Sequence, residues 1–550
     1  MDELPPELIE LIIEQCDFSS LKHMRLVTKR FEHLATPLVF RDFYAAFFAY
    51  SLGNIGKVAD NRVAKHVKNL TIYADFLPNW EQDEWRRERD RRPSFLSWKA
   101  RRKKLIVAGC LRTHQAANKL YDCLDGDIEG GLCEECLGRI ENVRVEYDKE
   151  FAYWPGSEQA WTRFCQLKDE QWNSLTEDVH GIMLKEHLSR LPNLESVAVK
   201  PALAPGEEIK NLPVWKSLHR EILVSPKNWM HISGPELHDT FDGQSVHNPE
   251  FLSSPLQWTL EAVGHRAQFS GTGQVKRLLL LHNDLTPLKE VIRAAVKASS
   301  TSDNPLAQGV RFQTVVEAFS HVSDLTFEFP YAGEAEEAYG GQFRDEAVEL
   351  LNAAKNLKIL KLQYQEEELD ESSMSMRFDL SGHFADLESN PDAFRWPHLT
   401  LLSLSTNVKA EPFLAFLAAH STTLRSLTLV EMDLGDVQKV LSAIPHVLPA
   451  LTDVRVECVI DIIQGTPGQE DEDDVWAHYL IKGTSHQDKY EQDVKRYLLG
   501  QREELPLLLD ENWMNAFSSG NSEDESEDES EEQTSENSNL NEDEDDDDQS

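Results

Sequence analysis

The stretch LPPELIELIIEQC, residues 4–16, combines two prolines with a short run of large apolar side chains. Apolar residues between positions 8 and 13 cover an arc of about 200° when they are placed at about 100° per residue on a helical wheel. A helix that lies on one core needs an apolar stripe of little more than about 100°. The stretch therefore predicts a helix that either lies deep in a core or covers two separate surfaces.

The residues that follow, DFSSLKHMRLVTKRFEHLATPLVF (17–40), predict two further short helices. The first helix should begin near Pro5 or Pro6, because proline is tolerated in a first helical turn. Residues 17–20 predict a break that caps the second helix. Three short helices in about 40 residues bury too little surface to be stable alone. Their apolar excess needs a partner, which is either the rest of this chain or another protein.

Residues 4–40 resemble the F-box, and the chain as a whole resembles F-box proteins of the fungal type. The F-box pattern opens with Leu-Pro-x-Glu-Leu and an Ile or Leu four residues on. It continues through Val-(Ser/Thr)-Lys-Arg-Phe and ends near Pro-Leu-aromatic. The matching residues are Leu4, Pro5, Glu7, Leu8, Ile12, Leu21, Leu26, Val27, Thr28, Lys29, Arg30, Phe31, Leu34, Ala35, Pro37, Leu38, Val39 and Phe40. The alternative is an amphipathic helical hairpin that belongs to the core of this chain.

The resemblance implies that this segment docks onto the adaptor subunit of SCF ubiquitin ligases, which joins it to the cullin scaffold. One side of the first helix would then pack on its own neighbours, and the other side would form the interface. A helix-in-groove contact of this kind is carried by a few large apolar anchors. By resemblance, the expected adaptor-binding residues are Leu4, Pro5, Leu8, Ile9 and Ile12, with Leu21, Leu26 and Val27 as further contacts. Spacing alone leaves open which of them face the adaptor and which face inward.

A short pattern, apolar-x-x-apolar-x-apolar, recurs through the rest of the chain and predicts short strands, because the residue types alternate. The copies begin at Val67, Leu194, Val275, Val322, Leu357, Leu399, Leu424 and Leu451. Within the last three copies, the residues expected on parallel strands are Leu402, Leu404, Leu427, Leu429, Val454 and Val456. Helix-like stretches precede or separate several copies, at 343–356, 411–421 and 436–448.

The last three copies start 25 and 27 residues apart, which is in the range of leucine-rich repeats. The region resembles an irregular leucine-rich-repeat solenoid, as found downstream of many F-boxes. Each unit is then a strand plus a helix, with the strands on one concave face and the helices on the other side. The alternative is an ordinary α/β domain with parallel strands.

The expected fold class is therefore α/β, with four regions along the chain. These are an F-box at 1–45, an irregular leucine-rich-repeat-like region with insertions at 46–465, a helical extension at 466–517 and a disordered acidic tail at 518–550. The tail has 16 acidic residues and no Lys or Arg. It has too few apolar residues to offset the entropy cost of ordering.

Charge and composition exclude several classes of protein. The net charge of −41 disfavours nucleic-acid binding, because phosphate would be repelled. No run of about 18 apolar residues occurs, so no membrane span is expected. Acidic Asp2 and Glu3 do not suit a secretory signal, and the odd number of cysteines does not suggest a disulfide framework. We expect a soluble protein of a reducing compartment, in the cytoplasm, the nucleus or both.

The acidic tail has a plain and a more specific interpretation. Like-charge runs are usually solvated segments that keep a protein soluble. Alternatively, the tail attracts a basic partner or is regulated by phosphate. Ser522 and Ser526 each have an acidic residue three positions on, the pattern that acidophilic kinases of the casein-kinase type prefer.

Two local features suggest binding chemistry. Residues 85–104 hold ten Lys or Arg. They predict a nuclear-localisation signal or an anion-binding patch. The alternative is an exposed, partly helical insertion that is anchored by Trp85 and Trp98. Cys133 and Cys136 have the spacing of a zinc-binding pair, with Cys110, Cys123 and His114 as scattered further ligands. Because a structural zinc site normally needs a second clear pair, loop cysteines without a metal are favoured, and no cofactor is expected.

No phosphate loop, dinucleotide-binding turn, His-Glu-x-x-His or Gly-x-Ser-x-Gly motif occurs, so no enzyme activity is expected. The predicted function is that of a substrate-recognition subunit of an SCF ubiquitin ligase. Its expected partners are the adaptor, through it the cullin, and an unknown protein substrate. The alternatives are an F-box scaffold that acts outside ubiquitin transfer and an acidic-tailed chaperone of basic proteins.

Overall fold

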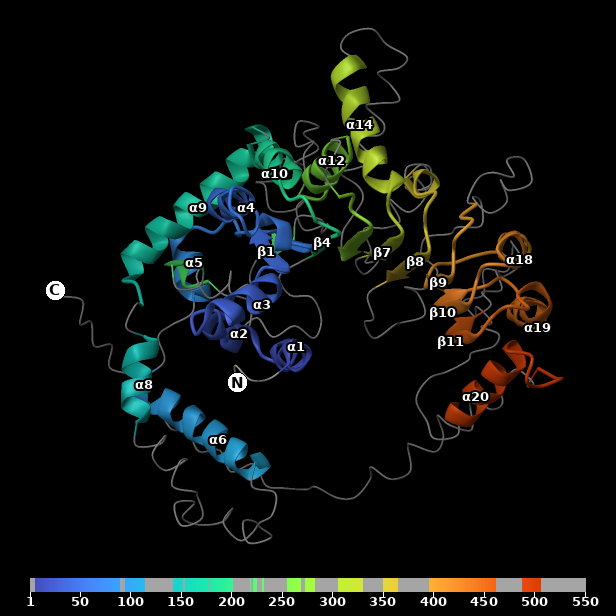
Figure 1. The fold of residues 1–550 in the computed structure, drawn as a ribbon, viewed down its shortest axis with the longest axis horizontal. Helices are drawn as coiled ribbons and strands as arrows, with labels where there is room; N and C mark the ends of the chain where they lie inside the picture. Colours follow the sequence, from blue (N-terminus) through green and yellow to red (C-terminus); the bar gives the residue numbers. More distant parts are fainter. Residues whose placement is uncertain are drawn as a thin grey trace, which may run out of the picture.

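The computed structural model describes most of the predicted elements. The described residues are 5–89, 94–113, 142–151, 154–177, 179–200, 218, 221–224, 230–231, 255–268, 273–281, 305–329, 350–364, 395–460 and 487–505. The acidic tail at 518–550, Cys123, Cys133, Cys136 and His114 lie outside these residues. Figure 1 shows three short helices beside one end of a long curved sheet.

The first three helices form as the sequence predicts. They are α1 (Pro6–Glu14), α2 (Phe18–Met24) and α3 (Lys29–Val39). Pro6 lies in the first turn of α1, where its missing N–H costs no hydrogen bond. A strand, β1 (Asp42–Ala46), follows α3 after two residues, so the helices are joined directly to the sheet.

The sheet has nine strands in the order β1-β2-β4-β6-β7-β8-β9-β10-β11, and each neighbouring pair is parallel. After β1, the strands are β2 (Asn69–Tyr73), β4 (Ser196–Lys200), β6 (Arg277–Leu281), β7 (Asp324–Phe329), β8 (Ile359–Tyr364), β9 (Leu401–Leu404), β10 (Ser426–Asp433) and β11 (Asp453–Ile460). Strands that follow one another in this sheet therefore also follow one another in the sequence, apart from a separate antiparallel pair, β3 (Asp75–Phe76) and β5 (Met230–His231).

The recurring apolar pattern locates eight of these strands, β2 to β11 in the sheet, because each begins two residues after the first residue of a copy. The prediction for the last repeats is confirmed. Leu402, Leu427 and Val454 lie side by side on parallel strands, as do Leu404, Leu429 and Val456. The predicted helices at 411–421 and 436–448 are α18 (Ala410–Ala419) and α19 (Val437–Val447). Of the predicted helix at 343–356, residues 343–349 lie outside the described residues.

Matched rows of apolar side chains make up the main core. One row places Leu70 of β2 beside Val197, and the register continues through the equivalent residue of every later strand. Its further members are Leu278, Leu325, Leu360, Leu402, Leu427 and Val454. All of these residues are buried in one hydrophobic cluster. The pattern is stable because each strand alone has only one apolar face, and stacking joins these faces into a continuous core.

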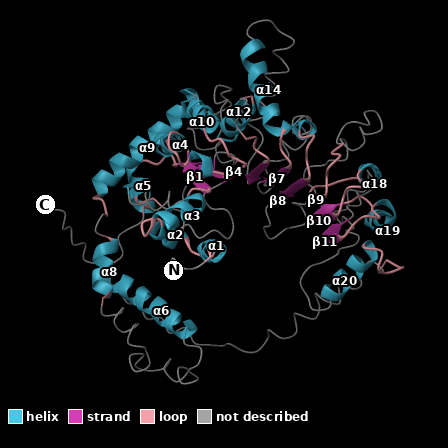
Figure 2. Ribbon diagram, in the orientation of Figure 1, coloured by secondary structure: helices cyan, strands magenta, loops and turns pink. Residues whose placement is uncertain are grey.

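Helices cover the outer side of the sheet, while the strands lie on the inner side of the arc, as Figure 2 shows. Besides α18 and α19, they are α4 (Ala49–Ala59), α10 (Val179–Ser189), α12 (Pro255–Ala267) and α14 (Pro305–Ser320). Helices α12 and α14 approach very closely at Gly264. A Cβ at this position would lie 1.7 Å from the backbone oxygen of Thr314. The glycine is therefore needed for the approach of these two helices.

A second group of helices lies beyond β1. They are α5 (Gln82–Glu88), α6 (Phe95–Thr113), α8 (Val143–Glu150) and α9 (Ser157–Glu177), with a short 3₁₀ turn, η1 (Ala64–His66), before β2. The two tryptophans of the basic segment are buried, Trp85 against α9 and Trp98 against α8. This agrees with the interpretation of residues 85–104 as a partly helical insertion anchored by its tryptophans.

Helix α20 (Gln487–Leu498) covers the last strand. Its Val494 and Leu498 join the main core, and the Tyr497 hydroxyl donates a hydrogen bond of 3.2 Å to the Ser442 carbonyl in α19. The Lys495 ammonium lies 3.1 Å from a carboxylate oxygen of Asp453, the first residue of β11. The later turns of α20 are therefore held at the amino end of β11 (Figure 1).

Candidate functional site

Helix α1 has two apolar faces, and only one of them is buried. Ile9 and Ile13 are each 1% exposed, in the core of the three-helix module. On the other face, Leu8, Leu11 and Ile12 are 48%, 58% and 43% exposed. These residues lie three and four positions apart, so their side chains share one side of the helix. The wide apolar arc of the sequence is therefore explained by two surfaces rather than by one deep core.

Local hydrogen bonds fix where α2 and α3 begin. The Asp17 carboxylate accepts a hydrogen bond of 2.6 Å from the Ser20 N–H, which caps α2. The Thr28 hydroxyl accepts one of 3.2 Å from the Phe31 N–H, which caps α3. Such caps satisfy amide groups that have no partner within the helix. The break between the helices lies at residues 15–17, slightly earlier than the predicted 17–20, because α1 ends at Glu14 and α2 already begins at Phe18; Asp17 caps α2 as predicted.

The core of the three-helix module is small and is separate from the core of the sheet. Its buried members are Ile9, Ile13, Leu21, Phe31, Ala35 and Val39. The predicted contacts Ile9 and Leu21 are therefore part of this core, where their side chains support the helices from inside. A core of this size leaves the outer apolar side chains without cover from the module itself.

The other predicted contact residues lie on the surface. Leu26 and Val27, between α2 and α3, are 84% and 66% exposed, and Pro5 is also exposed. Leu4 lies outside the described residues. That these residues bind an adaptor stays a prediction, but their exposure is what an interface requires.

Two exposed apolar residues were not among the predicted contacts. Leu11 lies beside Leu8 and Ile12 on α1, and Phe18 begins α2 with a ring that is 45% exposed. The Lys22 ammonium lies 4.2 Å from the centre of the Phe18 ring. The three-residue spacing from Leu8 is the signal that points to Leu11. No comparable signal marks Phe18, because a first-turn aromatic residue can equally pack inward. We call Leu8, Leu11, Ile12, Phe18, Leu26 and Val27 the apolar surface of α1–α2.

The three-helix module is tied to the segment before β2 by an ion pair as well as by the chain. The Arg62 guanidinium, next to η1, lies 2.9 Å from the Glu32 carboxylate in α3. Within the module, Arg25 donates a hydrogen bond of 3.0 Å to the Thr36 hydroxyl, and its guanidinium lies 4.8 Å from the centre of the Phe40 ring. None of these contacts involves a residue of α1, so they leave its outer face exposed.

The face of the sheet that is turned away from the helices is a second surface of mixed chemistry. One row of neighbouring residues on this face runs across all nine strands, and its middle part is Leu279, Thr326 and Lys361. These three side chains are half-buried. At the two ends of the row, Tyr44 and Arg455 are exposed. Polar, charged and apolar groups thus occur together on this face.

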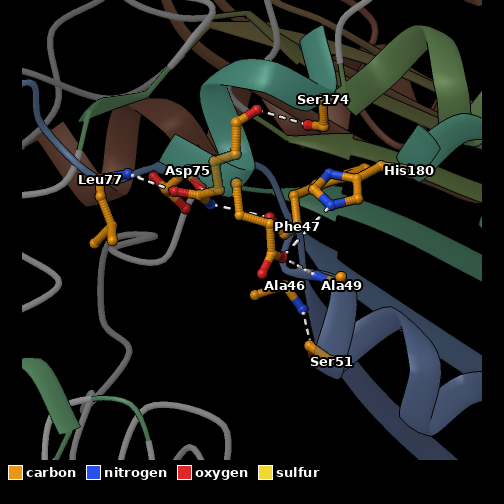
Figure 3. Close-up of polar contacts among 10 residues, drawn as sticks. Ala46, Phe47, Ala49, Ser51, Asp75, Leu77, Ser174 and His180 are labelled. Carbon is orange, nitrogen blue, oxygen red and sulfur yellow. Dashed lines mark hydrogen bonds and ion pairs between the residues drawn. The ribbon is translucent and has the colours of Figure 1, made fainter. Parts of the chain in front are cut away.

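A buried polar cluster around Gln171 of α9 holds this helix against the ends of β1 and β3 (Figure 3). The Gln171 side-chain oxygen accepts a hydrogen bond of 2.9 Å from the Leu77 N–H. Its amide nitrogen donates to the carbonyls of Phe47 and Asp75, at 3.0 and 3.3 Å. The Ser174 hydroxyl donates to the Gln171 carbonyl at 2.6 Å. These bonds are made mostly to backbone groups, so the cluster positions segments rather than a ligand.

The neighbouring pair of Glu170 and His180 completes this cluster. The Glu170 carboxylate accepts a hydrogen bond from the Ala49 N–H at the start of α4, and His180 Nε2 lies 3.8 Å from it (Figure 3). Burial raises the pKa of Glu170, but hydrogen bonds from His180 and Ala49 and nearby positive charge outweigh it, so the pKa is lowered. The carboxylate is therefore charged at neutral pH and anchors the start of α4.

The described part of the chain contains neither a metal-ligand cluster nor a membrane span. In the ranges that the structure covers, no group of three or more His, Cys, Asp or Glu residues is placed to hold a metal ion. No helix among these residues has the length and apolar character needed to cross a bilayer. Cys133 and Cys136, which have the spacing of a zinc-binding pair, lie outside the described residues.

Comparison with known protein families identifies the three-helix module. The family model of the F-box domain matches residues 1–42. The chain therefore contains an F-box domain. F-box domains bind the adaptor subunit of SCF-type ubiquitin ligases and thereby the cullin scaffold, so the domain supports a general role in substrate recognition by such a ligase. No curated protein matches the chain.

Proposed function

We propose that the chain is a substrate-recognition subunit of an SCF-type ubiquitin ligase, without catalysis of its own. The adaptor would bind the apolar surface of α1–α2, and a protein substrate would bind the sheet region. The observation that carries the proposal is the exposure of Leu8, Leu11 and Ile12 on a domain whose core is already filled. Large apolar anchors of this kind supply most of the energy of a helix-in-groove contact.

The proposed mechanism is proximity. The F-box domain fixes the chain to the ligase, and the sheet region holds the substrate, so that a substrate lysine meets the charged ubiquitin carrier. Holding two reactants together replaces a collision in solution by a step within one complex. The direct connection from α3 to β1, with the Arg62–Glu32 ion pair beside it, favours a fixed orientation between the two parts.

For the substrate-binding part, we infer an irregular leucine-rich-repeat-like solenoid. Support comes from parallel strands that keep their sequence order and from the aligned Leu and Val rows in the core. Insertions between β2 and β6 make the unit lengths unequal. An open sheet face of this type offers an extended surface for a protein segment. Binding of a substrate there, and location in the cytoplasm or nucleus, are parts of this proposal.

The adaptor contact is tested by replacing Leu8 and Ile12 together by Ala. Truncation of a large anchor that is buried in an interface costs roughly 2–5 kcal/mol where the site cannot relax. We therefore expect adaptor affinity to fall at least about a hundredfold, at about 1.4 kcal/mol per tenfold. The measurement is adaptor binding by the purified chain, together with its thermal unfolding.

The matched control is the double change Val179→Ala and Ile182→Ala on α10. These two side chains are also large, apolar and exposed, but they lie on the helix layer of the sheet. Adaptor affinity should stay unchanged in this control. Unchanged binding in the Leu8 and Ile12 variant would contradict the proposal. Lost binding with a collapsed main unfolding transition would instead favour the helical-hairpin interpretation.

A second measurement distinguishes the proposed substrate receptor from a scaffold that binds the adaptor but acts outside ubiquitin transfer. Affinity purification of a substrate receptor should recover both the adaptor and the cullin. At least one co-purifying protein should then become ubiquitylated in a reconstituted ligase, and the Leu8 and Ile12 variant should abolish this. Recovery of the adaptor without the cullin would favour the scaffold.

A further inference from the structure

The residue that precedes each strand occupies an equivalent position along one edge of the sheet, which we call the amino edge. The backbone shows the equivalence, because each N–H at this position donates to the carbonyl of the same position one strand earlier. Ser323 donates in this way to Lys276, Lys358 to Ser323 and Thr400 to Lys358, each at 2.8 Å. The ladder continues with Arg425 and Thr452, also at 2.8 Å. Side chains at this position are therefore arranged in one line across the sheet.

Basic and hydroxyl residues alternate along this line. The order from β6 to β11 is Lys276, Ser323, Lys358, Thr400, Arg425 and Thr452. Each hydroxyl lies within hydrogen-bonding distance of the carbonyl of the basic residue before it, at 3.3, 3.0 and 3.0 Å. The hydroxyl residues thus hold the backbone of the basic residues in place, while the basic residues themselves stay exposed.

The spacing of the basic residues follows from sheet geometry. Neighbouring strands lie about 4.8 Å apart, so a basic residue on every second strand recurs at intervals of about 10 Å. Lys276, Lys358 and Arg425 are all exposed. Neither lysine forms an ion pair with another described residue. We call these three residues the basic ridge.

Between β6 and β10 the surroundings of the basic ridge are also positive, whereas Glu195 and Asp453 flank it at β4 and β11 and are paired with Lys68 and Lys495. Between β6 and β10 the amino edge carries Arg277, Lys355 and Arg395 in addition to the ridge itself. Among the described residues of this edge, in 273–277, 320–324, 354–359, 395–401 and 420–426, the single acidic residue is Asp324. Its carboxylate lies 2.5 Å from the Arg277 guanidinium, so the charges of these two residues cancel. The amino edge therefore has a local excess of positive charge, in a chain whose net charge is −41.

We propose that the acidic segment 518–550 of the same chain binds the basic ridge. This segment has 16 acidic residues and no Lys or Arg, so it is complementary in charge to the ridge at any register. Opposite potentials steer such contacts and make them sensitive to salt. The inference is independent of the adaptor proposal, because it concerns a contact within the isolated chain.

The place where the described chain ends makes the contact reachable. Lys495, near the end of α20, pairs with Asp453 at the amino end of β11, and Leu505 packs against the main core. The first acidic residue of the segment, Glu523, follows 18 residues after Leu505. That length spans up to about 60 Å when extended. The ridge begins one strand spacing from β11 and ends five spacings away, at about 24 Å.

The chain that links Leu505 to the acidic segment also increases the occupancy of a weak contact. Exposed ion pairs contribute little each. A segment tied to its own binding surface by a short linker, however, meets it at an effective concentration in the millimolar range. The acidic segment would then cover the ridge against acidic segments of other proteins. Phosphate on Ser522 or Ser526 would add negative charge and tighten the contact.

The test is carbodiimide cross-linking of the full-length chain, which joins lysine amines to carboxylates that touch them. The acidic segment contains no lysine, so each of its cross-links reports a lysine elsewhere. We expect Lys276 and Lys358 to be the main partners at low salt, with yields at least about tenfold above those of Lys57 and Lys149. These two controls are also exposed, on α4 and α8. The yields at the ridge should fall strongly at about 1 M salt, where the screening length is about 3 Å.

A matched pair of variants gives an independent readout. Lys276→Glu with Lys358→Glu reverses two ridge charges, and Lys57→Glu with Lys149→Glu makes the same change in net charge elsewhere. Cleavage of the acidic segment by a Glu-specific protease should become about tenfold faster in the ridge variant, as expected for the loss of two exposed attractions. The control variant should be cleaved at the original rate.

Three results would overturn the proposal. The first is equal cross-linking of ridge and control lysines. The second is cross-linking centred on Lys99 and Lys103 of α6, which would assign the acidic segment to the basic segment 85–104. The third is cross-linking only between chains, detected by mixing isotopically labelled and unlabelled protein. Each of these results leaves the adaptor contact, measured separately, untouched.

Discussion

The F-box helices and the parallel sheet use apolar residues in opposite ways. In the sheet, apolar positions of the recurring pattern are buried in one continuous cluster that extends from β1 to α20. In the F-box domain, α1 buries Ile9 and Ile13 but leaves Leu8, Leu11 and Ile12 exposed. Neighbouring repeat units bury each other's apolar faces. Three short helices, in contrast, enclose a core that is too small to bury all of their apolar side chains. The exposed apolar residues of α1 therefore support the proposed interface, because the F-box domain has a buried core without them.

The largest expected effect on the sheet region is at Gly264, where helices α12 and α14 approach each other most closely. Gly264→Ala would place a methyl group 1.7 Å from the Thr314 backbone oxygen, so α12 and α14 must move apart. Overpacking of this kind costs about 3 kcal/mol. We expect the main unfolding transition to shift down in denaturant titration. Adaptor binding by any chain that stays folded should not change, and a loss of binding would show that the two parts are not independent.

A change within the small core should have the opposite pattern. Ile13→Ala removes a fully buried side chain from α1, which typically costs about 2–3 kcal/mol. The F-box domain should lose protection in hydrogen exchange, while the main transition of the sheet stays where it is. Leu26→Ala is the control, because its side chain is 84% exposed and should change stability by less than about 0.5 kcal/mol. Equal effects of the two changes would mean that the F-box has no core of its own.

A cap contributes less than a core residue. Thr28→Ala removes the hydroxyl that accepts the Phe31 N–H at the start of α3. Loss of such a cap costs about 1 kcal/mol. Local hydrogen exchange of α3 should become faster, and Thr28→Ser should restore most of the protection because its hydroxyl makes the same bond. Failure of Ser to restore it would show that the methyl group, not the cap, matters.

The smallest expected effect concerns pH and the sheet. Burial lowers the pKa of His420, whose Nε2 accepts a hydrogen bond of 3.2 Å from the Trp396 backbone N–H. A His whose pKa is lowered on folding stabilises the protein above its unfolded pKa of about 6.5 and loses this contribution as pH falls through the folded value. The free energy of unfolding should therefore decrease on acidification below about pH 6.5.

His420→Gln provides the comparison for this pH effect. The Gln side-chain oxygen can accept the same hydrogen bond but does not titrate in this range. The loss of stability between about pH 7.5 and about pH 5.5 should be smaller in the variant than in the original chain. An equal loss in both would assign the acid sensitivity to other groups, such as His187 and His265, whose pKa values are also lowered by burial.

Local sequence signals were sufficient for most strands and for the F-box helices. The recurring pattern placed eight strand starts, from Val67 to Leu451, because alternation of apolar and polar residues is a property of a single strand. It did not reveal β1, which has no copy of the pattern. The exposed face of α1 was only partly predictable. Helical spacing gives two apolar faces but does not say which one the neighbouring helices cover, as buried Ile9 and exposed Ile12 show.

The sequence by itself determined the F-box, the strand-plus-helix units and the charge of the segment 518–550, since each depends on residues that are close together in the chain. Only the tertiary structure decided which face of α1 is exposed and that Lys276, Lys358 and Arg425 form one line. The two lysines are 82 residues apart in the chain. Their alignment arises from the register of parallel strands, which brings equivalent positions together whatever the length of chain between them.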